Sequence, residues 1–529
     1  MVQTTGSSRR IAVQGSKIGR DKQKSKQRPR RMAHYEHGAS PVLDMLRPLS
    51  NADARRLREF FRAANYTQEA FESLRLPLNS LSRLSENMPL LLDRTREQTL
   101  SNLILRWFLL DLAASEEAAA ALMPQSLLEL LLECGMLVSD GESLSPSVML
   151  TPCDRCLFAA DTAARLTSHS PDLVIWPNAT TRLLHQFTIR RPTRAALDLG
   201  TGCGIQAVFA ADHSTRVTAT DLNPRAAQYA RFNAWLNGTA NIECLTGDTF
   251  EPVTNRAFDL IVANPPFFIT PSAEQIYCEN DMDLDQYCRR VAREAPAHLN
   301  AGAFLQMVCE WVEVRGQSWQ DRVKEWLDGT GCDAWIFHSY SRDAGEYARE
   351  RIGQAAAAGT ETEALAHWMK YYREREVEAV HGGMLAMRRR TGRNWVRIED
   401  MPLNPHQPFG DAVWQAFTCI DLLEPGGSDE ELLGSRLRLS PETQLDRHLQ
   451  QADGRWQAAG TTLRFTTGIP ASIRLDPAVA DFLVELDGRR TLGEVVRNLS
   501  QRVRADPEVV QRECVAIVRM LVQRRFVQP

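Results

Sequence analysis

The fold is decided by two stretches, Ala195-Ala-Leu-Asp-Leu-Gly-Thr-Gly-Cys-Gly204 and Phe258-Asp-Leu-Ile-Val-Ala-Asn-Pro-Pro-Phe267. In each of them a short apolar run ends in a turn that is marked by glycine or proline. Short apolar runs of this kind are typical of strands that are buried on both faces of a parallel sheet. We therefore expect the two turns to follow two strands of one sheet.

Further apolar runs on either side of these stretches extend the predicted sheet. The candidate strands are Ala195–Leu199, Val217–Thr220, Ile242–Leu245, Phe258–Ala263, Phe304–Cys309 and Ala334–His338, and helical stretches separate most of them. A helical insertion rich in Glu, Arg and Ala follows Arg342. Leu385–Arg389 and Trp395–Glu399 flank Thr391-Gly392 and predict a hairpin that closes the sheet with an antiparallel edge. The pattern predicts an α/β fold, a mostly parallel, Rossmann-like sheet covered by helices.

The sequence on either side of this domain predicts two flanking modules. The N-terminal one is helical from Ser50 and ends in a helix, Pro124–Cys134, followed by a hairpin at Asp140-Gly141, which is typical of a winged helix. The residues from Pro402 to Pro408 read as a linker. We expect a basic tail at 1–40, a helical, winged-helix-like domain at 41–165, the α/β domain at 166–400 and a small domain at 401–529.

The C-terminal module is predicted to be a compact helical or winged-helix-like domain. Helix starts are expected at Asp476-Pro477, at the capping box Thr491-x-x-Glu494 and at Asp506-Pro507. The segment from Leu486 to Glu494 resembles the small PqqD-like peptide-binding fold, over about sixty residues.

Composition bounds the class of protein. The chain has 529 residues, of which 43% are hydrophobic and 24% charged, and this is ordinary for a globular protein of several domains. No apolar run reaches the length of a membrane span and no signal-peptide pattern opens the chain, so a cytoplasmic location without membrane contact is expected. Cys153 and Cys156 form a C-x-x-C pair without a second half-site at zinc spacing, so we expect no metal.

The charge is distributed unevenly along the chain. Ten basic residues stand against Asp21 alone in residues 1–33, although the whole chain has a net charge of −4. Such a tail could be an arm that binds RNA or a segment that is only disordered.

The glycine-marked turn is suited to a ligand that approaches the backbone. Gly200, Gly202 and Gly204 leave no side chain in the way, and Asp198 ends the strand before them. The spacing is G-x-G-x-G rather than the dinucleotide G-x-G-x-x-G. Asp221 follows the next strand, where a carboxylate can accept hydrogen bonds from both hydroxyls of a ribose. These residues predict a nucleotide or nucleoside ligand and leave its identity open.

The proline-marked turn narrows the chemistry. Asn264 offers a side-chain oxygen, Pro265 a rigidly held carbonyl and Phe267 an aromatic face. Two acceptors beside an aromatic ring suit a planar NH2 group, whose hydrogens they accept and whose face stacks on the ring. The alternative is that Asn264-Pro-Pro-Phe267 is merely a rigid loop.

Together, Asp198-Leu-Gly-Thr-Gly-Cys-Gly204, Asp221-x-Asn-Pro, Gly247-Asp248 and Asn264-Pro-Pro-Phe267 resemble the class I methyltransferases that use S-adenosyl-L-methionine. The resemblance is to the HemK/PrmC type, which methylates glutamine in release factors, and it covers about residues 170–310. It implies that Gly200, Gly202 and Gly204 contact the methionine end of the cofactor. It also implies that Asp221 binds the ribose, that Asp248 reaches the adenine and that Asn264 with Pro265 binds the amide. Asp198 and Asn264 are also expected to contact the cofactor, and the expected catalytic residues are Asn264, Pro265 and Phe267.

The substrate is left between two classes by the resemblance. Phe267 stands where glutamine methyltransferases of this type usually have tyrosine, whereas phenylalanine is common in enzymes that methylate guanine N2 in RNA. The predicted function is N-methylation of a planar amino group in a macromolecule, with a protein glutamine first and an RNA base amine (guanine N2 or adenine N6) as the alternative. A nicotinamide-dependent oxidoreductase or a non-catalytic scaffold are remote alternatives, and oligomeric state is left open.

Overall fold

The computed structural model describes residues 46–73, 87–168, 170–272, 275–355, 361–401, 408–423, 428–452 and 454–529. The predicted basic tail, residues 1–40, lies outside the described residues, and so does nearly all of the predicted linker from Pro402 to Pro408. None of the helices in the described part of the chain combines the length and the apolarity needed to cross a bilayer.

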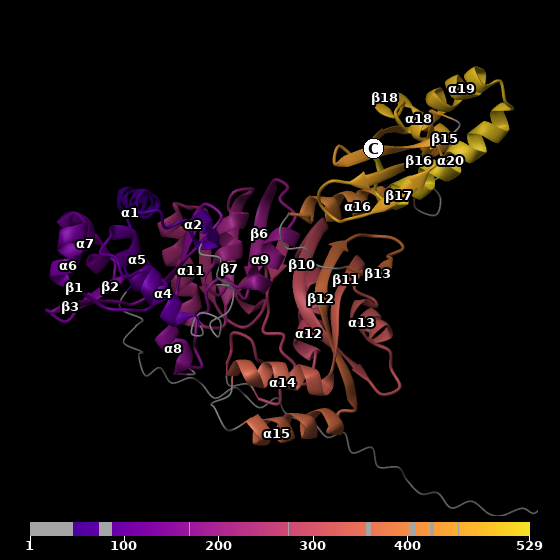
Figure 1. Cartoon of the computed structure of the whole chain (residues 1–529). Coiled ribbons are helices and arrows are strands. Elements are labelled where there is room, and N and C mark those ends of the chain that lie inside the picture. Colours follow the sequence, from indigo (N-terminus) through magenta and orange to yellow (C-terminus); the bar gives the residue numbers. More distant parts are fainter. Residues whose placement is uncertain are drawn as a thin grey trace, which may run out of the picture. The chain divides into compact units, whose positions relative to one another are not determined.

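The centre of the molecule is an eight-stranded sheet (Figure 1). Its strands are β6 (Thr193–Leu199), β7 (Ser214–Asp221), β8 (Ile242–Thr246), β9 (Phe258–Ala263), β10 (Leu299–Val314), β11 (Cys332–Asp343), β12 (Val377–Arg389) and β13 (Val396–Asp400). Their order across the sheet is β13-β11-β12-β10-β9-β6-β7-β8, and among these strands β12 alone runs antiparallel to its neighbours. All six strands expected from the sequence are confirmed, and the fold is the expected Rossmann-like α/β sheet.

The predicted edge hairpin is wrong. β12 inserts between β10 and β11 and is antiparallel to both, so neither of its sides is free to pair with the next strand. The chain therefore passes beyond β11, and β13 pairs with the outer side of that strand in parallel, with Ala334 opposite Val396. The turn at Thr391-Gly392 reverses the chain direction as expected, but β11 lies between the two strands that it joins, β12 and β13.

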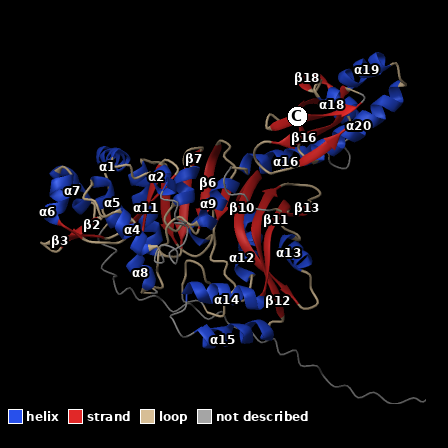
Figure 2. Ribbon diagram, viewed as in Figure 1, coloured by secondary structure: helices blue, strands red, loops and turns tan. Residues whose placement is uncertain are grey.

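Helices cover both faces of the sheet (Figure 2). Neighbouring strand residues such as Ala196 and Leu197, or Trp335 and Ile336, belong to different hydrophobic clusters, because successive side chains of a strand point to opposite faces. The helices over the face that carries Leu197 are α12 (Gln286–Glu294) and α13 (Trp319–Leu327). The helices over the opposite face are α9 (Ala179–Phe187), α10 (Ile205–Ala210), α11 (Pro224–Asn237) and α16 (Gly410–Leu422).

The insertion after β11 is helical, as predicted. It consists of α14 (Ala344–Ala355) and α15 (Glu361–Glu374), which lead into β12. Tyr347 and Tyr372 are fully buried in a cluster of their own with Ile269 and Val312. The insertion thus packs on the chain that follows the proline-marked turn.

The N-terminal module alternates short helices with short strands. Its elements are α1 (Asn51–Ala63), α2 (Gln68–Ser73), α4 (Met88–Arg94), α5 (Leu100–Phe108), β1 (Ala114–Ser115), α6 (Glu116–Leu122), α7 (Gln125–Glu133), β2 (Leu137–Ser139), β3 (Ser143–Pro146), β4 (Met149–Cys153), β5 (Cys156–Ala160) and α8 (Ala163–Thr167). Ser50 caps α1, and β2 pairs with β3 across the turn at Asp140-Gly141, so both local predictions are confirmed. The winged-helix interpretation of this module stays a prediction.

Two asparagines of α11 join the N-terminal module to the sheet domain. The Asn233 side chain accepts from the Ala159 N–H at 2.8 Å and donates to the Ala159 carbonyl at 2.8 Å. Asn237 makes the same pair of bonds with Leu157, at 3.0 and 2.7 Å. Spaced one helical turn apart, the two amides satisfy the backbone of β5 as a neighbouring strand would. A third hydrogen bond, which Asn233 donates to the Cys203 carbonyl at 2.8 Å, connects this junction to the glycine-marked turn.

The C-terminal module contains more β-structure than the sequence predicted. Its elements are α17 (Asp429–Gly434), β14 (Arg436–Leu439), β15 (Thr443–Ala452), β16 (Arg455–Phe465), β17 (Ser472–Leu475), α18 (Pro477–Leu483), β18 (Asp487–Thr491), α19 (Leu492–Val503), α20 (Pro507–Gln523) and β19 (Val527–Gln528). The three predicted helix starts are confirmed at α18, α19 and α20. Between the modules, α16 packs on the central sheet through Phe417 and on the C-terminal core through Cys419.

Candidate functional site

The two turns meet at the carboxyl edge of the sheet, as expected. Their strands β6 and β9 are parallel neighbours, and Leu199 pairs in register with Ala263. The next residues, Gly200 and Asn264, therefore open their turns side by side. A Cβ atom placed on Gly200 would lie 3.9 Å from the backbone oxygen of Asn264. In open α/β sheets ligands bind at this edge.

The glycine-marked turn needs glycine at each marked position. Gly200, Gly202 and Gly204 have φ angles of +71°, +55° and +85°, in the left-handed region that side chains disfavour. A Cβ on Gly204 would come within 2.7 Å of the Ala230 Cα, so α10 can approach α11 only through glycine. A Cβ on Gly202 would meet nothing within 4 Å. The turn is thus closely packed against α11 at Gly204 and open at Gly202.

Asp198 holds the glycine-marked turn in place. One oxygen of its carboxylate accepts from the Thr201 hydroxyl at 2.6 Å and from the Ala207 N–H at 2.9 Å. The side chain is only 1% exposed, and burial raises the pKa of this carboxyl to about 7. These contacts make Asp198 a positioning residue of the turn, and its predicted contact with the cofactor stays a prediction.

Asp221 lies at the end of β7 and faces the same turn. Its carboxylate accepts from the Gly202 N–H at 2.9 Å and from the Asn223 N–H at 2.8 Å. Burial raises the pKa of this carboxyl above its usual value. A carboxylate offers about four acceptor sites, so two remain after these bonds. That capacity matches the two ribose hydroxyls expected at this position.

Asp248 follows β8 and is held by an ion pair. Arg290 of α12 approaches its carboxylate at 3.0 Å, and the Thr249 hydroxyl donates to the other oxygen at 2.6 Å. Tyr287, one turn earlier on α12, interacts electrostatically with Asp248 and Asp221, and burial raises the pKa of its phenol to about 12. Tyr287 and Arg290 were not predicted from the sequence, because neither belongs to a motif with recognisable spacing.

The side-chain amide of Asn264 is available to a ligand. It is half-buried, and its amide makes no hydrogen bond to any residue that the structure describes. The turn behind it is fixed by Asn280, whose amide donates to the Pro266 carbonyl at 2.7 Å. Phe267 packs against the cores on both sides of the sheet and meets Phe268 edge to face at 5.5 Å. The turn is therefore rigid, with one uncommitted amide at its start.

The helical insertion clamps the chain beyond Phe268. The Ile269 N–H donates to the Tyr347 hydroxyl at 3.2 Å, and the Tyr372 hydroxyl donates to the Ile269 carbonyl at 2.7 Å. The Arg351 guanidinium stacks on the ring of Phe268 at 3.7 Å. Both α14 and α15 thus fix the position of the proline-marked turn.

A buried carboxylate anchors this clamp. Glu310, on β10, is 1% exposed and accepts hydrogen bonds from the Tyr340 and Tyr347 hydroxyls and from Arg351, the last at 2.6 Å. Burial raises the pKa of the Glu310 carboxyl, while Arg351 opposes that shift. This cluster was not predicted from the sequence. Its signal is an acidic residue inside the otherwise apolar run from Met307 to Val312.

Comparisons with known proteins follow the same division of the chain. Residues 177–312 match the family "Methyltransferase small domain", and residues 468–527 match the family "Coenzyme PQQ synthesis protein D (PqqD)". The release factor glutamine methyltransferase of Bordetella pertussis is 40% identical over 162 residues, 27% of this chain and 58% of that protein. The tRNA1(Val) (adenine(37)-N6)-methyltransferase of Actinobacillus pleuropneumoniae is 36% identical over 96 residues, 17% of this chain and 40% of that protein.

The matches to curated relatives cover only part of each relative. The chain spans about half the length of the curated relatives it matches. Among solved structures, a methyltransferase from Pyrococcus furiosus is 17% identical, and the alignment covers 43% of this chain and 97% of that one at a TM-score of 0.26.

Proposed function

We propose that the protein is an S-adenosylmethionine-dependent N-methyltransferase, and that residues 177–312 form its class I methyltransferase domain of the HemK/PrmC-like type. Its acceptor is a planar amino group, which we propose to be the side-chain amide of a glutamine in a protein. The observation that carries the proposal is the register of β6 and β9. This register sets the open face of the glycine-marked turn beside the uncommitted amide of Asn264.

The residues at the carboxyl edge fit S-adenosylmethionine. The space in front of Gly202 is open, so the methionine end of a ligand can lie against the backbone. Asp221 keeps two acceptor sites for the ribose hydroxyls, and Asp248, with which Tyr287 interacts, is the residue that we propose reaches the adenine. Bound there, the cofactor supplies an electrophilic methyl group on a positively charged sulfur.

The proline-marked turn has the task of preparing a poor nucleophile. The lone pair of an amide nitrogen is delocalised into its carbonyl. The Asn264 oxygen and the Pro265 carbonyl accept the two N–H hydrogens of the substrate, and Phe267 supports its flat face. Acceptors placed out of the amide plane would localise the lone pair. Orientation and charge placement then carry the catalysis.

A glutamine acceptor is supported from two directions. The relative from Bordetella pertussis is named for glutamine methylation of release factors. The C-terminal match to the PqqD family lies outside the methyltransferase domain and provides a second module, consistent with a polypeptide partner. We therefore infer a protein substrate in preference to a nucleic acid.

An exocyclic amine of an RNA base is the second candidate. Phe267 in place of tyrosine favours it, as does the relative from Actinobacillus pleuropneumoniae, whose name specifies adenine N6 of a tRNA. The ten basic residues within residues 1–33 are also suited to a phosphate backbone.

The variant Asn264→Ala tests the proposed function. Affinity for S-adenosylmethionine should stay within a few-fold, whereas methyl transfer to acceptors in a cell extract should fall by about 10²–10³-fold, as when one oriented polar group is removed from a reaction centre. Asn300→Ala is the matched control. Asn300 lies near the start of β10, at the opposite edge of the sheet, where its amide donates to Asp259 at 2.7 Å. Normal methyl transfer by Asn264→Ala would reduce the proline-marked turn to a rigid loop without a catalytic role.

A further inference from the structure

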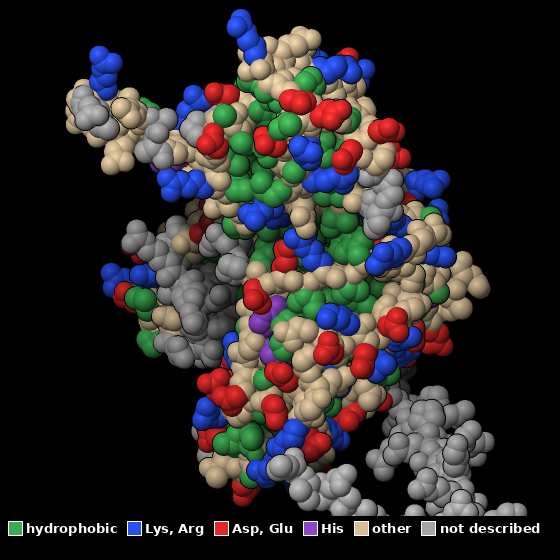
Figure 3. Space-filling model, turned by 90° about the vertical axis from the view of Figure 1, so that its right-hand side faces the viewer, with side chains coloured by type: hydrophobic (Ala, Val, Ile, Leu, Met, Phe, Trp, Pro, Cys, Tyr) green, Lys and Arg blue, Asp and Glu red, His purple; other side chains and the backbone are tan. Residues whose placement is uncertain are grey.

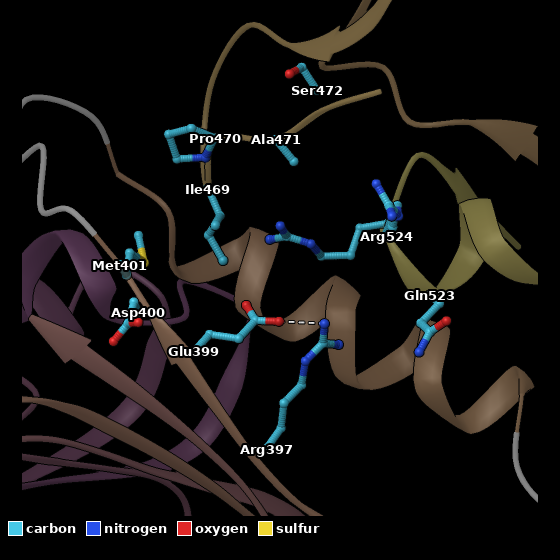
Figure 4. Close-up of a pocket in the computed structure, with 11 residues that line it drawn as sticks. Arg397, Glu399, Asp400, Met401, Ile469, Pro470, Ala471, Ser472, Gln523 and Arg524 are labelled. Carbon is cyan, nitrogen blue, oxygen red and sulfur yellow. Dashed lines mark ion pairs between the residues drawn. The ribbon is translucent and has the colours of Figure 1, made fainter. Parts of the chain in front are cut away.

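A cavity of about 460 Å³ lies between β13 and the C-terminal module (Figure 4), and none of the residues that line it belongs to either turn. Arg397 and Glu399 line it from β13, Ile469 and Pro470 from the loop between β16 and β17, and Arg524 with Arg525 from the chain that follows α20. Its volume is in the range of pockets that hold small ligands or single side chains of a partner.

The acidic groups of this pocket are already paired, whereas two of its arginines are not. Glu399 forms an ion pair with Arg397, drawn as a dashed line in Figure 4. The Asp400 carboxylate lies 2.6 Å from His338 Nδ1. The side chains of Arg524 and Arg525 form no ion pair and no hydrogen bond with any residue in the described ranges. The pocket therefore has an excess of positive charge that the protein leaves unbalanced.

Arg525 is held in a fixed position at the wall of the pocket. Its guanidinium lies over the rings of Trp335 and Phe465, at 5.6 Å from each centroid. Its backbone has a φ of +70°, and its N–H donates to the Val522 carbonyl at 2.9 Å, which ends α20. Burial lowers the pKa of this guanidinium to about 10. A charge partly withdrawn from water is costly, and Glu399, the acidic group that acts on Arg525, is already paired with Arg397, so an anionic ligand would reduce that cost.

We propose that this pocket is a second binding site, separate from the methyl-transfer site, and that it takes a carboxylate group of a polypeptide. A guanidinium whose face is covered by aromatic rings keeps its N–H edge free, and that edge matches a carboxylate with two parallel hydrogen bonds. Arg524, which is exposed, adds a second positive charge at the mouth.

The charge pattern around the pocket favours a carboxylate over the phosphates of a nucleic acid. On the face that Figure 3 shows, basic and acidic side chains are interspersed, whereas a nucleic-acid surface carries a continuous basic stripe. Because a nucleic acid carries one negative charge on every phosphate, Glu399 and Asp400 within the pocket also disfavour a run of adjacent phosphates more than one carboxylate group.

The test uses the full chain and the peptide acetyl-Glu-Glu-Glu-amide, with acetyl-Gln-Gln-Gln-amide as its uncharged counterpart. Saturation-transfer NMR should detect binding of the glutamate peptide, at least about tenfold tighter than binding of the glutamine peptide or of inorganic phosphate. Equal binding of both peptides would contradict a carboxylate site. Tighter binding of phosphate, or of a short RNA oligonucleotide, would overturn the carboxylate in favour of a phosphate ligand.

Three arginine variants locate the site. Arg525→Gln should weaken binding of the glutamate peptide about tenfold or more, and Arg524→Gln several-fold, because each removes one of the unbalanced charges. Arg512→Gln removes the same charge from an exposed position of α20 outside the pocket and should leave binding unchanged. Far-UV circular dichroism establishes whether each variant is folded. If Arg525→Gln does not fold, Arg524→Gln alone tests whether the pocket binds the glutamate peptide. Unchanged binding by the folded pocket variants, or an equal loss with Arg512→Gln, would refute the proposal.

Discussion

Replacing Asp221 by alanine should weaken the binding of S-adenosylmethionine by a large factor. The carboxylate accepts two backbone N–H groups of the protein and keeps about two acceptor sites for a ligand. Each hydrogen bond to a charged group contributes about 1.5–3 kcal/mol. Loss of two such bonds to a ribose amounts to about 3–6 kcal/mol, or roughly 10²–10⁴-fold in the dissociation constant.

Calorimetric titration with S-adenosylmethionine measures this loss directly. Asp221→Asn keeps the size of the side chain and one acceptor oxygen but removes the charge, so its affinity should lie between those of the alanine variant and the unaltered protein. Asp212→Ala serves as the control, because Asp212 is an exposed aspartate of the same domain that pairs with Arg155. Thermal unfolding recorded beside each titration shows whether the variant is folded when it is measured.

One outcome would refute the reasoning about Asp221. If folded Asp221→Ala binds S-adenosylmethionine within about twofold of the unaltered protein, the carboxylate serves only to hold the Gly202 N–H. The ribose would then have to bind elsewhere.

Three further predictions concern the packing around the site. Gly204→Ala should lower the melting temperature more than Gly202→Ala. Both variants lose about 1–2 kcal/mol because they place a side chain at positive φ, but only at Gly204 would the new Cβ also collide with the Ala230 Cα, at 2.7 Å. Equal losses in the two variants would contradict the close approach of α10 to α11. Glu310→Gln should destabilise the protein by about 3–5 kcal/mol in chemical denaturation, because it removes the buried negative charge that Arg351 and the Tyr340 and Tyr347 hydroxyls contact; a loss below about 1 kcal/mol would show that the cluster is not needed for stability. Burial raises the pKa of the Asp198 carboxyl from 3.8 to about 7, so its contribution to stability is full below about pH 4 and is lost as the pH rises through 7. Asp198→Asn should remove this dependence and be the more stable form at pH 8, which denaturation at several pH values can check.

The strands and both turns could be predicted from the sequence because their signals are local. An apolar run that ends in glycine or proline identifies β6 and β9, and the parallel arrangement then brings Asp198 and Asn264 to one edge. Pairing between strands is not local. The turn at Thr391-Gly392 has the sequence of a hairpin, yet the neighbour of β12 is set by the insertion of that strand between β10 and β11.

The parts that escaped prediction depend on contacts distant in sequence. Glu310 and Arg351 are separated by 41 positions, and nothing in either local sequence names the other. Strands β15 and β16 were missed because most of their side chains are polar and Leu463 is among the few that are buried. A pattern with so little apolar alternation gives no strand signal, although the backbone pairing is extensive.

The central claim is that the chain methylates a planar amide of a protein, and labelled S-adenosylmethionine tests it most directly. The full chain is incubated with a cell extract and cofactor tritiated on the methyl group, and Asn264→Ala serves as the blank. We predict that the macromolecular label resists ribonuclease, is released by protease, and appears as methylamine after acid hydrolysis, because a methylated glutamine amide yields methylamine on cleavage. Label that is released by ribonuclease would show that the substrate is RNA. No label above the Asn264→Ala blank would contradict the account itself.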